Sequence, residues 1–350
     1  MRSTRVDAAT GAVRPSRASG GGELRSVKTR TITRADLDLT EFSFGGAPLG
    51  NLYQEINDDD AASTLDAAWE AGLRYFDTAP HYGLGLSERR FAAGLSARPR
   101  SEYVLSTKVG RRLIPRESGP LGPDPDFAVP ASHKRVWDFS RDGILRTLEA
   151  SLTRLGTDHV DIVYLHDPDD HWEEAASAGF GTLDELRSQG VVRAIGVGMN
   201  QSAMLTRFVR ETDLDVVMLA GRYTLLEQGA LDDLLPAALE RNTAVVAVGV
   251  FNSGLLSQPR PAPGAKYNYA DAPAELVRRA NDIADVCERH RVTLPAAALH
   301  FPLMHPAVVS VAIGMNSAAQ VERNMDLYAL TIPADLWDEL HEVGLVRRTA

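Results

Sequence analysis

The chain has 350 residues, of which 44% are apolar and 24% are charged, and its formal net charge is −10. This composition is typical of a globular protein, and the length suffices for one large barrel or two ordinary domains. A nucleic-acid-binding face would need clustered basic charge, so the acidic balance argues against nucleic acid as a partner. The sequence predicts no membrane span and no secretory signal, and Cys287 is the only cysteine, so a cytoplasmic location is expected.

Residues 1–30 carry scattered arginines without apolar periodicity, which predicts a disordered tail before a single domain over residues 31–350. In that domain, short apolar runs alternate with amphipathic stretches, which indicates parallel strands buried on both faces. The eight runs are Phe42–Leu49, Tyr75–Asp77, Val104–Lys108, Ile162–His166, Ala194–Val197, Val216–Leu219, Ala244–Val250 and Val308–Ile313. Eight repeats favour an α/β fold of the (β/α)8 TIM-barrel class over an open sheet.

Two connections in this pattern are unusually long. Residues Gly110–Trp137 follow the third run and residues Phe251–Asp271 follow the seventh, and both segments are rich in proline and glycine. Because both follow strands, both should overhang the mouth of the barrel, where loops of this length are usually functional. The expected helices between the strands include Asp58–Gly72, Asp142–Leu155, Trp172–Gln189, Leu231–Arg241 and Ala274–Arg289, and a further helix is expected near the C-terminus.

Four titratable side chains stand at or just after the ends of three predicted strands. Asp77, Lys108 and His166 each end an apolar run, and Tyr82 follows five residues after the first of them. Side chains at the C-terminal ends of barrel strands converge on one mouth, so these four should form a proton-transfer site. An ammonium about 4 Å from the phenol would stabilise tyrosinate by roughly 4 kcal/mol at an effective dielectric of ~20, against an opposing cost of desolvation. The sequence therefore predicts an unusually acidic Tyr82.

Longer motifs around these residues resemble the aldo-keto reductase superfamily. The similarity runs from about Phe42 to Leu340 and is carried by Phe76–Gly83 with Ser87 and Glu88, Ser106–Lys108, Leu155–His166, Ser253–Leu256 and Ile313–Asn324. Within the superfamily, Leu219–Leu226 and Phe251–Gly254 resemble the branch of sugar 1-dehydrogenases of the D-threo-aldose or L-fucose type, which also includes pyridoxal dehydrogenases.

The resemblance implies the same four roles that the chemistry of the side chains suggests. Tyr82 would be the general acid in reduction and the base in oxidation. Lys108 would lower the pKa of Tyr82, and Asp77 would hold Lys108 in place. His166 would orient the substrate oxygen by a hydrogen bond. The candidate substrate contacts are His81, Trp137 and Tyr53. No histidines have the paired spacing of a metal site, so no metal is expected.

A nicotinamide cofactor is implied by the same resemblance. No convincing G-x-G-x-x-G motif opens a strand–helix unit, whereas barrels commonly bind phosphate at the loops after strands seven and eight. The loop Gly314–Asn316 lacks the basic residue that NADPH-preferring relatives carry, so the sequence favours NAD, while the nearby Arg323 leaves NADP open. The implied cofactor-binding residues are Gly50, Asn51, Leu52, Asn200, Phe251, Asn252, Ser253, Leu255, Gly314, Met315, Asn316, Gln320 and Asn324.

The implied function is NAD(P)-dependent oxidation of the anomeric carbon of an aldose to a lactone by hydride transfer. The nearest alternative is pyridoxal 4-dehydrogenase activity on a hemiacetal, which resembles a cyclic sugar. A broad NADPH-dependent aldehyde reductase and a non-catalytic redox-sensing subunit also stay open. A barrel isomerase or aldolase would instead use Lys108 as a Schiff base. The sequence names neither the aldose nor the oligomeric state.

Overall fold

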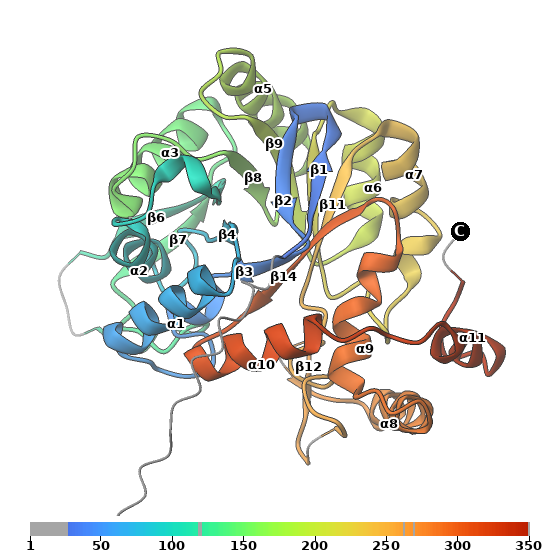
Figure 1. Cartoon of the computed structure of the whole chain (residues 1–350). Helices are drawn as coiled ribbons and strands as arrows, with labels where there is room; N and C mark the ends of the chain where they lie inside the picture. Colours follow the sequence, from blue (N-terminus) through green and yellow to red (C-terminus); the bar gives the residue numbers. More distant parts are fainter. Residues whose placement is uncertain (1–26, 118–120, 262, 269, 349–350) are drawn as a thin grey trace, which may run out of the picture.

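The computed structural model describes residues 27–117, 121–261, 263–268 and 270–348 (Figure 1). Most of the predicted tail, residues 1–26, lies outside the described residues. The end of the predicted tail is ordered, in contrast to the predicted disorder, because Thr29 and Arg30 belong to strand β1 (Thr29–Ile32).

Eight parallel strands form a closed barrel, which confirms the predicted TIM-barrel fold. Each of the eight apolar runs contributes one strand. The first run is shorter as a strand than predicted, because Ala47–Gly50 form a 3-10 turn. In their order around the barrel the strands are β10 (Val216–Ala220), β11 (Ala244–Val248), β14 (Val308–Gly314), β3 (Phe42–Gly45), β4 (Tyr75–Asp77), β5 (Val104–Val109), β8 (Ile162–His166) and β9 (Ala194–Met199).

Helices surround the barrel (Figure 1). They are α1 (Asp58–Glu70), α2 (Leu86–Leu95), α3 (Arg141–Leu155), α4 (Trp172–Glu174), α5 (Phe180–Ser188), α6 (Ser202–Glu211), α7 (Leu234–Arg241), α8 (Ala274–Arg289), α9 (Leu294–His300), α10 (Ala318–Tyr328) and the expected C-terminal α11 (Ala334–Glu342). The predicted helix Trp172–Gln189 is interrupted by a π-helical turn at Ala175–Gly179. No helix in the described part of the chain is long and apolar enough to cross a membrane.

An antiparallel hairpin of β1 and β2 (Leu37–Thr40) covers one end of the barrel (Figure 1). Its apolar side chains Ile32, Leu37 and Leu39 are buried. They pack in one cluster with residues near the N-terminal ends of the barrel strands, among them Val104 and Val216. The hairpin therefore closes the end of the barrel opposite to the one where Asp77, Lys108 and His166 stand.

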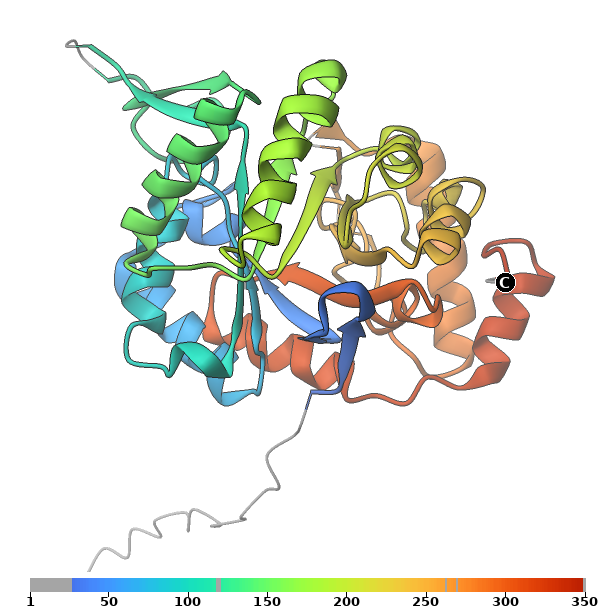
Figure 2. The same ribbon diagram turned by 90° about the horizontal axis from the view of Figure 1, so that it is seen from above.

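The two long connections contain hairpins instead of being structureless loops. In the first, β6 (Arg111–Pro115) pairs with β7 (His133–Trp137), and this hairpin extends beyond the barrel (Figure 2). In the second, the short strands β12 (Lys266–Tyr267) and β13 (Ala270–Asp271) pair. Both connections follow barrel strands, as predicted, and the first brings several charged side chains to the mouth.

Candidate active site

A buried ion pair joins the ends of β4 and β5. The Nζ atom of Lys108 lies 2.6 Å from Oδ2 of Asp77 and donates a second hydrogen bond to the Thr78 carbonyl at 3.0 Å. The two side chains are only 2% and 5% exposed. Burial alone would lower the pKa of Lys108, but the Asp77 carboxylate raises it and the net direction is upward. Lys108 is therefore a fixed positive charge inside the barrel mouth.

A series of hydrogen-bonded hydroxyl groups inside the barrel orients the Asp77 carboxylate. Ser106 donates to Oδ1 of Asp77 at 2.7 Å, and the Tyr75 hydroxyl lies 3.1 Å from both Ser106 Oγ and the Tyr164 hydroxyl. Ser106 has one proton and gives it to the carboxylate, so Tyr75 must donate to Ser106 and Tyr164 to Tyr75. All of these groups are buried, and the second carboxylate oxygen is thereby held towards Lys108.

The loop that carries Tyr82 is fixed by a close backbone contact with the turn after β3. A Cβ atom on Gly50 would lie 2.5 Å from the carbonyl carbon of Tyr82, and one on Gly83 would lie 2.4 Å from the carbonyl oxygen of Gly50. Gly83 also has a φ of +61°, which favours glycine. Glycine at both positions lets the two segments touch, and this contact sets the position of Tyr82.

Tyr82 lies beside the ion pair, but its phenol is not unusually acidic. The Nζ atom of Lys108 is 4.8 Å from the centroid of the Tyr82 ring. Burial raises the pKa of Tyr82 to about 12, because it outweighs the opposing effect of the Lys108 charge, and Asp77 adds to the rise. The predicted net lowering of the Tyr82 pKa is therefore wrong. The lysine acts in the expected direction, but desolvation of the phenolate is the larger effect.

His166 completes the group of four predicted residues at the end of β8. Its ring centroid is 5.9 Å from that of Tyr82 in an edge-on arrangement. Burial lowers the pKa of His166 well below its usual value, with Arg111 and Lys108 acting in the same direction. The imidazole is therefore neutral. Its Nδ1 atom is buried without a hydrogen-bond partner among the described residues, so it offers an unused polar atom. The structure brings Asp77, Tyr82, Lys108 and His166 together.

Charged residues that the sequence did not single out surround this group. Arg111 of β6 forms an ion pair with Asp167 at 2.9 Å, and its guanidinium lies over the ring of Trp137. Trp137 donates from Nε1 to the Asp167 carbonyl at 3.4 Å. Asp167 follows His166 directly and has a left-handed φ of +45°. The only signal for Arg111 and Asp167 in the sequence is their place just after barrel strands. In barrels, functional residues concentrate on the loops at these strand ends.

The three predicted substrate contacts lie in different settings. The His81 ring is 5.6 Å from that of His166 and 6.0 Å from that of Tyr82, so His81 belongs to the same cluster. Trp137 is 40% exposed on the hairpin and reaches the cluster through Asp167. Tyr53 is 65% exposed on the turn after β3. Contact of any of the three with substrate stays a prediction.

The predicted cofactor residues lie at or beyond the C-terminal ends of strands, with Gln320 and Asn324 in helix α10, and their side chains are in contrasting environments. Asn252 is buried and bonds to Thr224 at 2.8 Å and Gly221 at 3.3 Å. Asn51 is likewise engaged, because its side chain accepts from Arg90 at 2.7 Å. Met315 is buried in the core, so its side chain packs within the protein and does not face the mouth. Their roles towards a cofactor stay predictions. The remaining residues fall into buried or half-buried (Gly50, Leu52, Phe251, Ser253, Leu255, Asn316, Asn324) and exposed groups (Asn200, Gly314, Gln320).

The N-terminus of α10 suits the phosphates of a nicotinamide cofactor. It follows β14 directly, and Ser317 caps it by accepting from the Gln320 amide at 3.3 Å. Gly314 is exposed just before it, and the Asn316 amide donates to Oε1 of Gln320 at 2.9 Å. Amide groups at a helix N-terminus bind anions, and barrels commonly use this position for phosphate. The residues present therefore fit such a cofactor.

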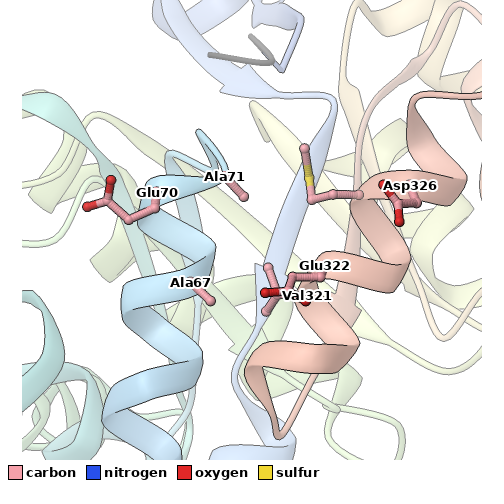
Figure 3. Close-up of a pocket in the computed structure, with 7 residues that line it drawn as sticks. Ala67, Glu70, Ala71, Val321, Glu322 and Asp326 are labelled. Atoms are coloured by element: carbon pink, nitrogen blue, oxygen red, sulfur yellow. The ribbon is translucent and has the colours of Figure 1, made fainter. Parts of the chain in front are cut away.

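A groove of about 330 Å³ lies elsewhere, on the outer surface between α1 and α10 (Figure 3). It is lined by the C-terminal end of α1 and the middle of α10, and none of the predicted site residues lines it. The lining residues are Ala67, Glu70, Ala71, Val321, Glu322, Met325 and Asp326. Within the described ranges, no three His, Cys, Asp or Glu side chains gather in a metal-binding arrangement.

Comparison with known proteins places this geometry in context. The Aldo/keto reductase family profile matches residues 41–344. A D-threo-aldose 1-dehydrogenase from a Pseudomonas species is 49% identical over 317 residues, which cover 89% of this chain and 96% of that protein. A pyridoxal 4-dehydrogenase from Microbacterium luteolum is 38% identical and covers 92% of this chain and 99% of its own length. Among solved structures, an aldo-keto reductase from Bacillus halodurans in its holo form aligns with a TM-score of 0.72 and 26% identity, covering 93% of this chain and 98% of that one.

Proposed function

Because this chain belongs to the aldo-keto reductase family and is an NAD(P)-dependent oxidoreductase, we propose that it oxidises carbon 1 of an aldose to a lactone. The observation that carries the proposal is the 49% identity to a D-threo-aldose 1-dehydrogenase over nearly the whole length of both proteins. The cluster of Asp77, Tyr82, Lys108 and His166 supports it, because it supplies the proton transfer that hydride transfer requires.

In this proposal, the hydroxyl on the anomeric carbon binds between Tyr82 and His166. Tyr82 takes the hydroxyl proton during oxidation and returns it during reduction, and its high pKa means that it begins reduction in the protonated form. The neutral imidazole of His166 forms a hydrogen bond with the same oxygen. Lys108 stabilises the phenolate that forms in oxidation, and Asp77 keeps the ammonium in place. A bound nicotinamide would supply the hydride acceptor.

The proposed cofactor is NAD. The turn of Gly314, Met315 and Asn316 before α10 offers no basic side chain to a 2′-phosphate, which favours the unphosphorylated nucleotide. Arg323 is the nearby cation to consider, and its guanidinium donates to the Ser257 carbonyl. That contact occupies one of the N–H donors of Arg323, and a 2′-phosphate would have to compete with the Ser257 carbonyl for the guanidinium. Titration with NAD and NADP, followed by quenching of intrinsic fluorescence, tests this choice, and tenfold tighter binding of NADP would overturn it.

The substrate is tested by an initial-rate screen of aldoses and pyridoxal with each nucleotide. The proposal expects the highest kcat/KM with an aldose and NAD, and a lactone as the product. Pyridoxal is the second candidate, because a pyridoxal 4-dehydrogenase is 38% identical over 92% of this chain. A preference for pyridoxal, or for open-chain aldehydes with NADPH, would replace the aldose proposal. A Tyr82→Phe variant run beside the wild type shows whether any observed turnover comes from this site.

A further inference from the structure

His81 lies among the proposed catalytic side chains and is itself held by an unusual set of contacts. Its ring is within 6.0 Å of the rings of both Tyr82 and His166, measured between centroids. Phe127 packs edge-on against it at 5.1 Å. The His81 residue is half-buried, so it keeps some contact with solvent. Any ligand between Tyr82 and His166 would therefore lie close to this third ring.

The contact with Arg135 determines which nitrogen of His81 carries the proton. Arg135 of β7 donates from Nε to Nδ1 of His81 at 2.6 Å. A guanidinium has donors only, so Nδ1 must accept with its lone pair and cannot carry a proton. In a neutral imidazole the proton then lies on Nε2, which faces away from Arg135. The hairpin thus imposes one tautomer on His81.

The orientation of Arg135 is fixed by Asp124. The two terminal nitrogens of Arg135 bond to the two carboxylate oxygens of Asp124 at 2.7 and 2.8 Å. Asp124 is buried and also accepts from the backbone amides of Asp126 and Phe127 at 3.2 and 3.1 Å. Bidentate pairs of this kind restrict the guanidinium to one plane. The Nε–H of Arg135 is therefore aimed at His81 independently of any ligand.

The charges around His81 keep it neutral. Burial lowers the pKa of His81 to about 2, and Arg111, Arg135 and Lys108 all act in the same direction. The nearby carboxylates do not compensate, because each is paired with a cation: Asp124 and Asp126 with Arg135, Asp167 with Arg111, and Asp77 with Lys108. His81 thus presents a neutral N–H donor throughout the pH range in which the protein would work.

From these contacts we propose that Arg135 is a positioning residue, which holds His81 with its proton on Nε2 so that this N–H donates to a substrate oxygen next to the reacting carbon. The identity of the substrate rests on the proposed function, whereas the tautomer does not. In an aldose, the adjacent oxygens are the ring oxygen and the 2-hydroxyl, and both can accept this bond. The arrangement favours substrates with an oxygen beside the carbinol over simple alcohols.

The tautomer is tested directly by long-range ¹H–¹⁵N correlation spectra of the full-length protein. The His81 signal is the one that disappears in His81→Asn or His81→Gln, and through-bond assignment of the wild type identifies it if neither variant folds. We expect a protonated Nε2 and a bare Nδ1, unchanged between about pH 6 and 9. Arg135→Met should mix the two tautomers. A wild-type signal from the Nδ1–H form or from an imidazolium would overturn the proposal.

The donor role is tested by two variants that separate the nitrogens. In His81→Asn the short amide can accept from Arg135 near the position of Nδ1, but the Nε2–H is lost. In His81→Gln the longer amide can place a donor near the position of Nε2. We expect kcat/KM for the aldose to fall about threefold to tenfold in the first variant, mainly through KM, and less in the second. Equal values for His81→Asn and wild type would refute a donor role.

A 2-deoxyaldose distinguishes the two acceptor oxygens. A loss in His81→Asn that disappears with the 2-deoxyaldose assigns the bond to the 2-hydroxyl, and a loss that persists assigns it to the ring oxygen. A wild type inactive on every aldose would overturn the proposed function, while the nuclear magnetic resonance result would still decide the state of His81. The failure of one proposal is therefore distinguishable from the failure of the other.

Discussion

The substitution Asp77→Asn should destabilise the protein by exposing the cost of a buried, unpaired ammonium. Coulomb's law at 2.6 Å and an effective dielectric of about 20 gives an attraction of roughly 6 kcal/mol between Lys108 and Asp77. Desolvation of the two charges offsets part of this attraction, and removing one partner of a buried pair typically costs about 3–5 kcal/mol. Asparagine has nearly the shape of aspartate, so packing around the site is preserved and the change reports on charge.

Thermal unfolding followed by circular dichroism or calorimetry measures the effect. For 350 residues, at an unfolding entropy of about 2.1 cal/mol/K per residue, this loss lowers Tm by roughly 4–7 °C. The double variant Asp77→Asn/Lys108→Met should recover most of the loss, because no unpaired charge remains. Lys134→Met, at an exposed position on β7, controls for removal of a lysine. An unchanged Tm in Asp77→Asn would refute the reasoning that an unpaired ammonium at this buried position is costly.

Three further predictions concern Tyr82 and its support. Tyr82→Phe should lower the rate of oxidation by ~10²–10⁴-fold while the cofactor Kd from fluorescence titration stays constant, and a wild-type rate would contradict its role in proton transfer. Because the pKa of Tyr82 is raised to about 12, its base form grows about tenfold per pH unit below that value, so kcat/KM for oxidation should rise from about pH 7 to 9. The rate of reduction, which uses the protonated form, should stay flat over the same range, and initial rates in both directions measure the contrast. Gly50→Ala places a Cβ atom 2.5 Å from the Tyr82 carbonyl carbon and should lower kcat more than it changes KM. Gly181→Ala in α5, where the added methyl group meets open space, is the matched control, and equal kcat values for the two variants would contradict the proposed contact.

The barrel could be predicted because parallel strands buried on both faces appear in the sequence as nearly unbroken apolar runs. The four apolar residues of Val216–Leu219 are all buried, for example, and the run is visible without any knowledge of its neighbours. The hairpin of β1 and β2 was missed because its strands have four residues each and adjoin a segment without periodicity. Strands this short give too few alternations to distinguish them from a turn.

The proposed catalytic cluster could be predicted only in part, for a different physical reason. Asp77, Lys108 and His166 were visible because each ends a strand. Arg135 and Asp124 lie within a loop rich in proline and glycine, and their bond to each other and to His81 depends on how β7 folds back onto the mouth. The direction of the shift in the Tyr82 pKa could not be predicted from the sequence either. The distance to a neighbouring charge can be guessed from the fold, but the desolvation of the phenol depends on all the atoms packed around it.

In the proposed reaction, the closed base of the barrel constrains where the proton taken up by Tyr82 can travel. The hydroxyl series behind Asp77 ends at Tyr164, which shares an apolar cluster with Ile32, Leu37 and Leu39 of the β1–β2 hairpin. Among the described residues, the Tyr164 hydroxyl bonds to no side chain other than Tyr75, so the series is a dead end for proton conduction along the axis. A proton released from Tyr82 must therefore reach bulk solvent on the same side from which substrate arrives. Reactant entry, product departure and re-equilibration of the phenol with buffer all share a single opening.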